Sequence, residues 1–203
     1  MLQTILRPLA LTLVSVLFVG SAHATSGFAS FREMSDYYTA VQLSNRFLDC
    51  VDRAANADDD PDAVADAVSC FGSVLADDFT ITIDGVAGSR PFPDPASFVA
   101  FATGPANAIR TNVSILPGVY SARGFEGRGR RRRVSVRSNI DIVQTVVAPN
   151  PVFGTVLGGQ DVRGVISFTA AQVKGGEWRI TSSRFTVLDI QSGLDIQSLP
   201  RLQ

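Results

Sequence analysis

The chain has 203 residues, of which 45% are hydrophobic and 18% charged, and its formal net charge is −1. This balance argues against a protein that binds nucleic acid through a broad basic surface. One histidine and two cysteines are too few for the usual zinc sites, so we expect no metal and no cofactor.

Residues 1–24 have the features of a secretory signal peptide. Arg7 precedes an apolar core at residues 9–19, and the small residues Ala22 and Ala24 follow it. The alternative is a membrane anchor, but a span needs about 20 apolar residues and this core is shorter. We therefore expect cleavage after Ala24 and an exported product, periplasmic or secreted, with no transmembrane segment left.

The mature chain should form one domain, residues 25–190, followed by a tail at 191–203. Cleavage removes Arg7 and His23, which leaves 17 basic and 19 acidic residues and a formal charge of −2. A mature chain without histidine cannot use Ser-His-Asp or Cys-His catalysis. Carboxylates, tyrosines, arginines and asparagines remain for chemistry.

Two helices are predicted first. The sequence from Ser30 to Glu33 is typical of a capping box, and apolar residues at helical spacing extend this helix to about Ala55. Asp60 and Pro61 predict the start of a second helix, which should end near residue 75.

Cys50 and Cys70 lie at equal distances from the break between these helices. In an antiparallel helix pair, equal distance from the turn places two residues side by side. In an oxidising compartment we expect a disulfide between them; the alternative is two buried free thiols.

Beyond the helices the hydrophobic period changes from 3.6 to 2, which predicts strands. On residues 133–147 the even positions are mostly apolar and the odd positions polar, so one face should be packed and the other wet. The expected elements are strands at 78–84, 109–115 and 133–147, a short helix at 94–102, a loop at 150–160, and a final hairpin of 162–174 with 177–190. Helices followed by such strands predict an α+β fold, with helices covering one face of a strongly curved antiparallel sheet.

Two segments carry a resemblance to a known family. "VLADDFTITIDG" (74–85) and "VKGGEWRITSSRF" (173–185) resemble, in order and spacing, segments of the SnoaL-like domains of the nuclear transport factor 2-like superfamily. The resemblance spans about residues 31–190. It implies a cone that encloses an apolar pocket, and a homodimer. The superfamily includes ketosteroid isomerase, polyketide cyclases, dehydratases and many non-catalytic binding or assembly domains, so the fold does not decide the function.

The chain departs from the catalytic pattern of this superfamily. The position of the general-base aspartate is Ile83, with Asp84 one residue later, and the position of the helical tyrosine is Val51. No histidine lies near Asn112 or Asn139. We therefore expect an exported domain that holds a small apolar molecule without catalysis, or that serves in an assembly. The alternative is an enzyme of the cyclase, isomerase or dehydratase type.

For that alternative, Asp84 is the candidate general base and Tyr38 a candidate electrophilic partner. A carboxylate in an apolar pocket can have its pKa raised toward neutrality. Asp84 is more simply explained as a turn residue before Gly85, and a buried tyrosine more often simply packs. One of the two neighbouring tyrosines should face the interior. The candidate ligand-binding residues are Tyr37, Tyr38, Arg110, Asn112, Phe168, Trp178 and Arg184.

An arginine-rich run precedes the longest predicted strand. Glycines flank it, and no aromatic residue is interleaved with it, so we interpret it as a solvated loop and expect no nucleic-acid partner. The alternative is the binding of an anionic surface or polymer. The residues concerned are Arg128, Arg130, Arg131, Arg132 and Arg133.

Overall fold

A computed structural model describes residues 28–57, 60–85, 88–104, 110–127, 132–150 and 154–194. The chain divides into two compact units, Met1–Asp36 and Tyr37–Gln203. In the first unit the serine half of the predicted capping box is present: the Glu33 amide donates to Ser30 Oγ at 3.2 Å. The Glu33 carboxylate accepts from the amide of Ala29 at 2.7 Å, one residue before the predicted Ser30. The predicted signal peptide lies outside the described residues.

The three described helices begin where their capping residues predict. They are α2 (Phe31–Ala55), α3 (Pro61–Val74) and α4 (Pro95–Ala102). Asp60 caps α3 by accepting from the Asp62 amide at 3.0 Å, and Asp94 caps α4 by accepting from the Ser97 amide at 2.7 Å. In α3 and α4 a proline takes the first helical position, where its missing amide hydrogen costs nothing.

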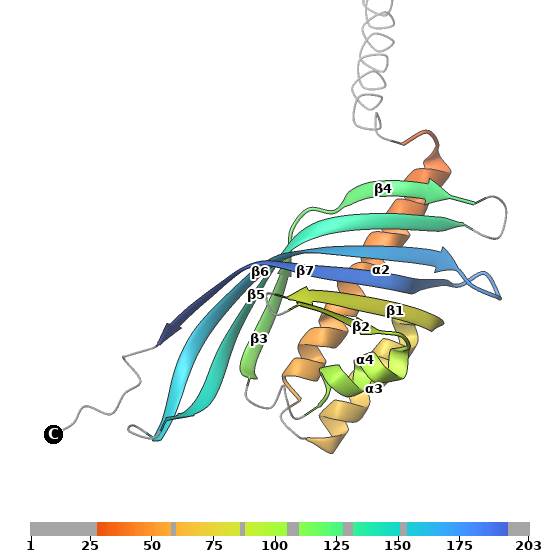
Figure 1. The fold of residues 1–203 in the computed structure, drawn as a ribbon. Helices are drawn as coiled ribbons and strands as arrows, with labels where there is room; N and C mark the ends of the chain where they lie inside the picture. Colours follow the sequence, from red (N-terminus) through yellow and green to blue (C-terminus); the bar gives the residue numbers. More distant parts are fainter. Residues whose placement is uncertain are drawn as a thin grey trace, which may run out of the picture. The chain divides into compact units, whose positions relative to one another are not determined.

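The strands form one seven-stranded sheet in the second unit (Figure 1). The order is β2-β1-β7-β6-β5-β3, and β4 pairs with β5 beside β3. The strands are β1 (Leu75–Gly85), β2 (Gly88–Phe92), β3 (Arg110–Pro117), β4 (Ser121–Glu126), β5 (Arg133–Asn150), β6 (Gly154–Gln172) and β7 (Trp178–Leu194). Figure 1 shows the long strands β5 and β6 bending together away from the helices, so the sheet is strongly curved.

The α+β class is confirmed, with four differences of detail. The β1–β7 pairing is parallel, so the sheet is mixed rather than antiparallel. β2 and β4 were not predicted, because each is short and largely exposed. Most of the expected 150–160 loop is strand, since β6 begins at Gly154 and pairs with β5 from there. The expected tail is shorter, because β7 continues to Leu194 along β6.

The core of the second unit is centred on Phe47 of α2. Its ring stacks on Phe98 of α4 at 5.6 Å and meets Phe71 of α3 and Phe168 of β6 edge-on at 5.9 and 5.3 Å. Phe47 and Phe168 are 1% exposed. One aromatic cluster therefore holds this part of α2, α3 and α4 on the same face of the sheet.

The predicted disulfide is confirmed. Cys50 of α2 and Cys70 of α3 are bonded, with their Cα atoms 5.5 Å apart and a sequence separation of 20. The bond ties the two helices together beside the aromatic cluster.

Replacing both cysteines by alanine should lower the free energy of unfolding by about 3 kcal/mol, because the unfolded chain gains the entropy of the opened loop. Urea unfolding with and without a reductant measures this. The wild type should lose the same amount when reduced, whereas the double variant should not respond to reductant. Equal stability of all four samples would contradict a stabilising bond.

Candidate functional site

A cavity of about 350 Å³ lies in the second unit between the curved sheet and the ends of α2 and α4. Its described walls are aliphatic and aromatic except for one pair of glutamines, and none of the lining residues is ionisable. They are Val51, Ala55, Ile83, Phe98, Phe101, Ala102, Val113, Ile115, Ile142, Gln144, Gln160, Val162, Phe185, Val187 and Ile190.

The cavity exists because the helices fill only part of the inner face of the sheet. The aromatic cluster packs over the start of β1 and the end of β6, whereas the cavity lies over the end of β5 and the middle of β6. On the helical side, the small side chains of Ala55 and Ala102 face the cavity. Protein interiors are otherwise packed nearly as densely as crystals, so a space of this size is a feature that needs an explanation.

The polar exception in the cavity wall is a cross-strand pair. Gln144 of β5 lies opposite Gln160 of β6 in the register, and its Nε2 donates a hydrogen bond to Oε1 of Gln160. Gln144 is 4% exposed. Neither residue stood out as a site candidate in the sequence, although Gln144 occupies an even position on the strand whose even positions are mostly apolar. A polar residue among the alternating apolar positions of a half-buried strand is the sequence signal that identifies Gln144.

Asp84 does not belong to the cavity lining. Its neighbour Ile83 lines the cavity, and since side chains alternate along a strand, the Asp84 carboxylate lies on the opposite face of β1. There it accepts a hydrogen bond from Nε of Arg184 at 2.6 Å, with Thr186 Oγ1 3.4 Å away. The hydrogen bonds from Arg184 and from Ser89 hold the pKa of Asp84 below its usual value.

This environment is the reverse of the one that suits a general base. A base works best when its pKa is near the operating pH, and the Arg184 partner moves the pKa of Asp84 in the other direction. The geometry therefore brings together the candidates Asp84 and Arg184 as an exposed ion pair on the outer face of the sheet.

Of the two candidate tyrosines, Tyr37 faces the interior. Its hydroxyl donates to the backbone carbonyl of Tyr120 at 2.7 Å, and burial raises its pKa. Tyr38 is 57% exposed. Neither tyrosine lines the cavity, so Tyr38 has no position from which to act on a molecule held there.

The other candidate ligand-binding residues also lie away from the cavity. Phe168 is part of the aromatic cluster, and Trp178 packs against the edge of the core beneath the Arg132 guanidinium. The side chains of Arg110 and Asn112 lie outside the described residues.

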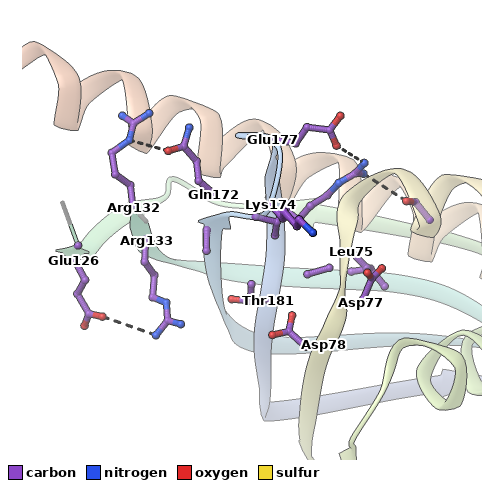
Figure 2. A pocket seen from close by; sticks show the side chains of 16 residues that line it. Leu75, Asp77, Asp78, Glu126, Arg132, Arg133, Gln172, Lys174, Glu177 and Thr181 are labelled. Atoms are coloured by element: carbon purple, nitrogen blue, oxygen red, sulfur yellow. Dashed lines mark hydrogen bonds and ion pairs between the residues drawn. The ribbon is translucent and has the colours of Figure 1, made fainter. Parts of the chain in front are cut away.

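A larger, charged groove of about 740 Å³ opens at another part of the second unit, where the starts of β1, β5 and β7 meet the end of β6 (Figure 2). Four acidic and four basic side chains line it, so their charges balance. They are Asp77, Asp78, Glu126 and Glu177, and Arg132, Arg133, Lys174 and Arg179.

The arginines of this groove are held by neighbouring groups. Arg132 donates to Gln172 at 3.2 Å, and Arg133 lies 3.9 Å from Glu126, as Figure 2 shows. Arg179 pairs with Glu177 at 2.8 Å and also donates to the Ser73 carbonyl at the end of α3. Arg128, Arg130 and Arg131 of the predicted anion-binding run lie outside the described residues. Among the residues that the structure describes, no group of three or more acidic, cysteine or histidine side chains could hold a metal ion.

Replacing Asp84 by Asn should lower the free energy of unfolding at neutral pH, because the ion pair with Arg184 is lost. A carboxyl whose pKa is lowered on folding stabilises the protein above its ordinary pKa, and this contribution disappears as the pH falls through the lowered value. Urea unfolding from pH 7 down to about 2 should therefore show the wild type and Asp84→Asn converging below about pH 4.

Asp78→Asn is the matched control, because this carboxylate lies on the same strand and forms no hydrogen bond or ion pair within the described part of the chain. It should leave stability at neutral pH nearly unchanged. A difference between the wild type and Asp84→Asn that stays constant over the whole pH range would contradict the ion pair.

Comparison with known proteins identifies the fold of this chain. No model of a protein family matches the sequence, and no curated protein matches it either. A hexachlorocyclohexane dehydrochlorinase, LinA type 2, is similar in structure with a TM-score of 0.58 at 15% identity, over 85% of this chain and 99% of that one.

Two proteins of Novosphingobium aromaticivorans are also similar in structure. A putative aromatic ring hydroxylase matches with a TM-score of 0.54 at 16% identity, over 79% of this chain and 94% of that one. A putative scytalone dehydratase matches with a TM-score of 0.53 at 8% identity, over 78% and 90%. At these identities the likeness shows the fold alone. The chain shares the fold of these three structures, which is the nuclear transport factor 2-like fold that its sequence resemblance implies.

Proposed function

We propose that this protein is an exported binding domain that holds a small, mostly apolar molecule in the 350 Å³ cavity without transforming it. The observation that carries the proposal is the cavity itself, whose described walls are apolar and bear no ionisable side chain.

The physical basis is the burial of apolar surface. Removing apolar area from water contributes about 25 cal/mol per Å². A cavity lined by aliphatic and aromatic side chains has few partners for water and favours an apolar occupant. Ligand pockets of proteins run from about 300 to 1,000 Å³. This cavity lies at the lower end of that range, which favours a small molecule.

The alternative of a cyclase, isomerase or dehydratase has less support. Two of the similar structures are named as a dehydrochlorinase and a putative dehydratase, but catalysis by this chain would need an acid or base at the cavity. Asp84 is turned to the other face and paired with Arg184, and the predicted mature chain has no histidine.

Export is supported by two independent features. The first is the signal-like segment at residues 1–24. The second is the Cys50–Cys70 disulfide, since such bonds persist mainly in oxidising compartments. None of the helices that the structure describes is long and apolar enough to span a membrane. The homodimer and the binding of an anionic surface remain predictions from the sequence.

Replacing Ile142 by Trp should weaken binding of a small apolar probe, because the indole would occupy part of the cavity. Naphthalene is a suitable probe, since its own fluorescence reports transfer from water to an apolar site. The affinity should fall by about tenfold or more relative to the wild type.

Val143→Trp is the matched control. Val143 is the next residue of β5, is 47% exposed and is not part of the cavity lining, so its replacement should leave binding unchanged. Equal binding by both variants, each with an intact circular dichroism spectrum, would contradict the cavity as the site. Absence of binding by the wild type would contradict the proposed function.

Expression of the full chain in a bacterium should yield an exported protein that begins at Thr25, because cleavage is expected after Ala24. Intact mass of the periplasmic fraction measures this. Ala22→Asp, which places a charge before the cleavage site, should leave the precursor uncleaved. A product that retains residues 1–24 in the wild type would contradict export by this route.

A further inference from the structure

The glutamine pair is the one polar feature of the described cavity wall, and it comes from the two strands that bend together away from the helices (Figure 1). Gln144 shares its face of β5 with Ile140 and Ile142, which are apolar and buried or partly buried. Gln160 faces it from β6. An amide in this position is not needed for packing, since an aliphatic side chain would fill the same strand position.

The hydrogen bonding of Gln144 is incomplete. Its amide can make four hydrogen bonds, two as donor and two as acceptor. Among the described residues it makes one, from Nε2 to Gln160 Oε1. Its Oε1 and its second N–H thus have no partner there, although the residue as a whole is 4% exposed. Oε1 is not among the fully buried described atoms that lack a partner, so it keeps some accessible surface at the cavity wall. Polar groups in such largely buried positions are nearly always hydrogen-bonded.

A ligand hydroxyl can bind the open N–H and one of the two acceptor sites of Oε1. It can donate to Oε1 of Gln144 and accept from the remaining N–H, whereas a carbonyl can only accept. A charged ligand group would find no counter-ion among the described lining residues, and burial of an unpaired charge is strongly unfavourable.

We infer that Gln144 is a specificity-determining residue, and that the cavity binds a neutral, mostly apolar molecule carrying a hydroxyl group. The inference rests on the proposed function, because it assigns the ligand class of the same cavity. It goes beyond that function by predicting discrimination between molecules of equal shape.

Three naphthalene derivatives test the inference by fluorescence titration: naphthalene, 2-naphthol and 2-naphthoate. The wild type should bind 2-naphthol about tenfold more tightly than naphthalene, which corresponds to one net hydrogen bond, and 2-naphthoate more weakly than either. Gln144→Met keeps the length of the side chain and removes the amide, so the preference for 2-naphthol should fall to about twofold or less.

Two further variants keep the test decisive. The double variant Gln144→Met/Gln160→Met removes the second amide of the cavity wall as well. Gln191→Leu is the matched control, because Gln191 is an exposed glutamine of β7 outside the cavity lining, and it should keep the full preference.

The outcomes separate the two proposals. Binding of naphthalene and 2-naphthol with equal affinity by the wild type would overturn the inference and leave the binding function standing. A preference that survives in both the single and the double variant would also overturn it. Failure of every probe to bind the wild type would contradict the proposed function, and the inference with it.

Discussion

Packing around Phe47 determines how the helices cover the sheet. The ring contacts Phe71, Phe79, Phe98 and Phe168, so one side chain joins α2, α3 and α4 to strands β1 and β6. Because the helices are held at this cluster, they cover only part of the inner face of a sheet whose long strands continue beyond them. The Cys50–Cys70 bond lies beside the cluster and restrains the same helix pair.

The cavity follows from this arrangement. On the helical side, the cavity is lined by small side chains, among them Ala55 of α2 and Ala102 of α4. Residues of β5, β6 and β7 form much of the remaining wall. The strand period then decides the chemistry, since it turns Ile83 and Phe185 toward the cavity and Asp84 and Arg184 toward the outer face. Asp84 and Arg184 neutralise each other on the outer face of the sheet. The only polar side chains of the described cavity wall are then the two glutamine amides.

Much of the fold could be predicted because its signals are local. Capping residues predicted the helix starts, the equal spacing of Cys50 and Cys70 predicted the disulfide, and the alternation on β5 identified its packed face. The parallel β1–β7 pairing and the extension of β6 into the expected loop could not be predicted in this way. They depend on strands far apart in sequence, and a Gly-rich segment such as Gly154–Gln160 becomes a strand through its pairing with β5.

The site was harder to predict than the fold. Charged and aromatic residues attract attention in a sequence, yet Asp84, Arg184, Phe168 and Trp178 all have structural roles or lie on other surfaces. The cavity is formed by ordinary apolar residues that no motif distinguishes. In the sequence, Gln144 stands out only as a polar residue among alternating apolar positions. Its place in the site depends on its pairing with Gln160 of the neighbouring strand.

The central claim is that a small molecule binds inside the cavity. Methyl NMR of isoleucine-labelled protein, titrated with 2-naphthol, tests it directly, because four of the described isoleucines line the cavity and others lie in the packed core. The account predicts that resonances of Ile83, Ile115, Ile142 and Ile190 shift with a common affinity, while those of Ile166 and Ile180 change little. Unchanged resonances for the four lining residues at saturating 2-naphthol would contradict the account.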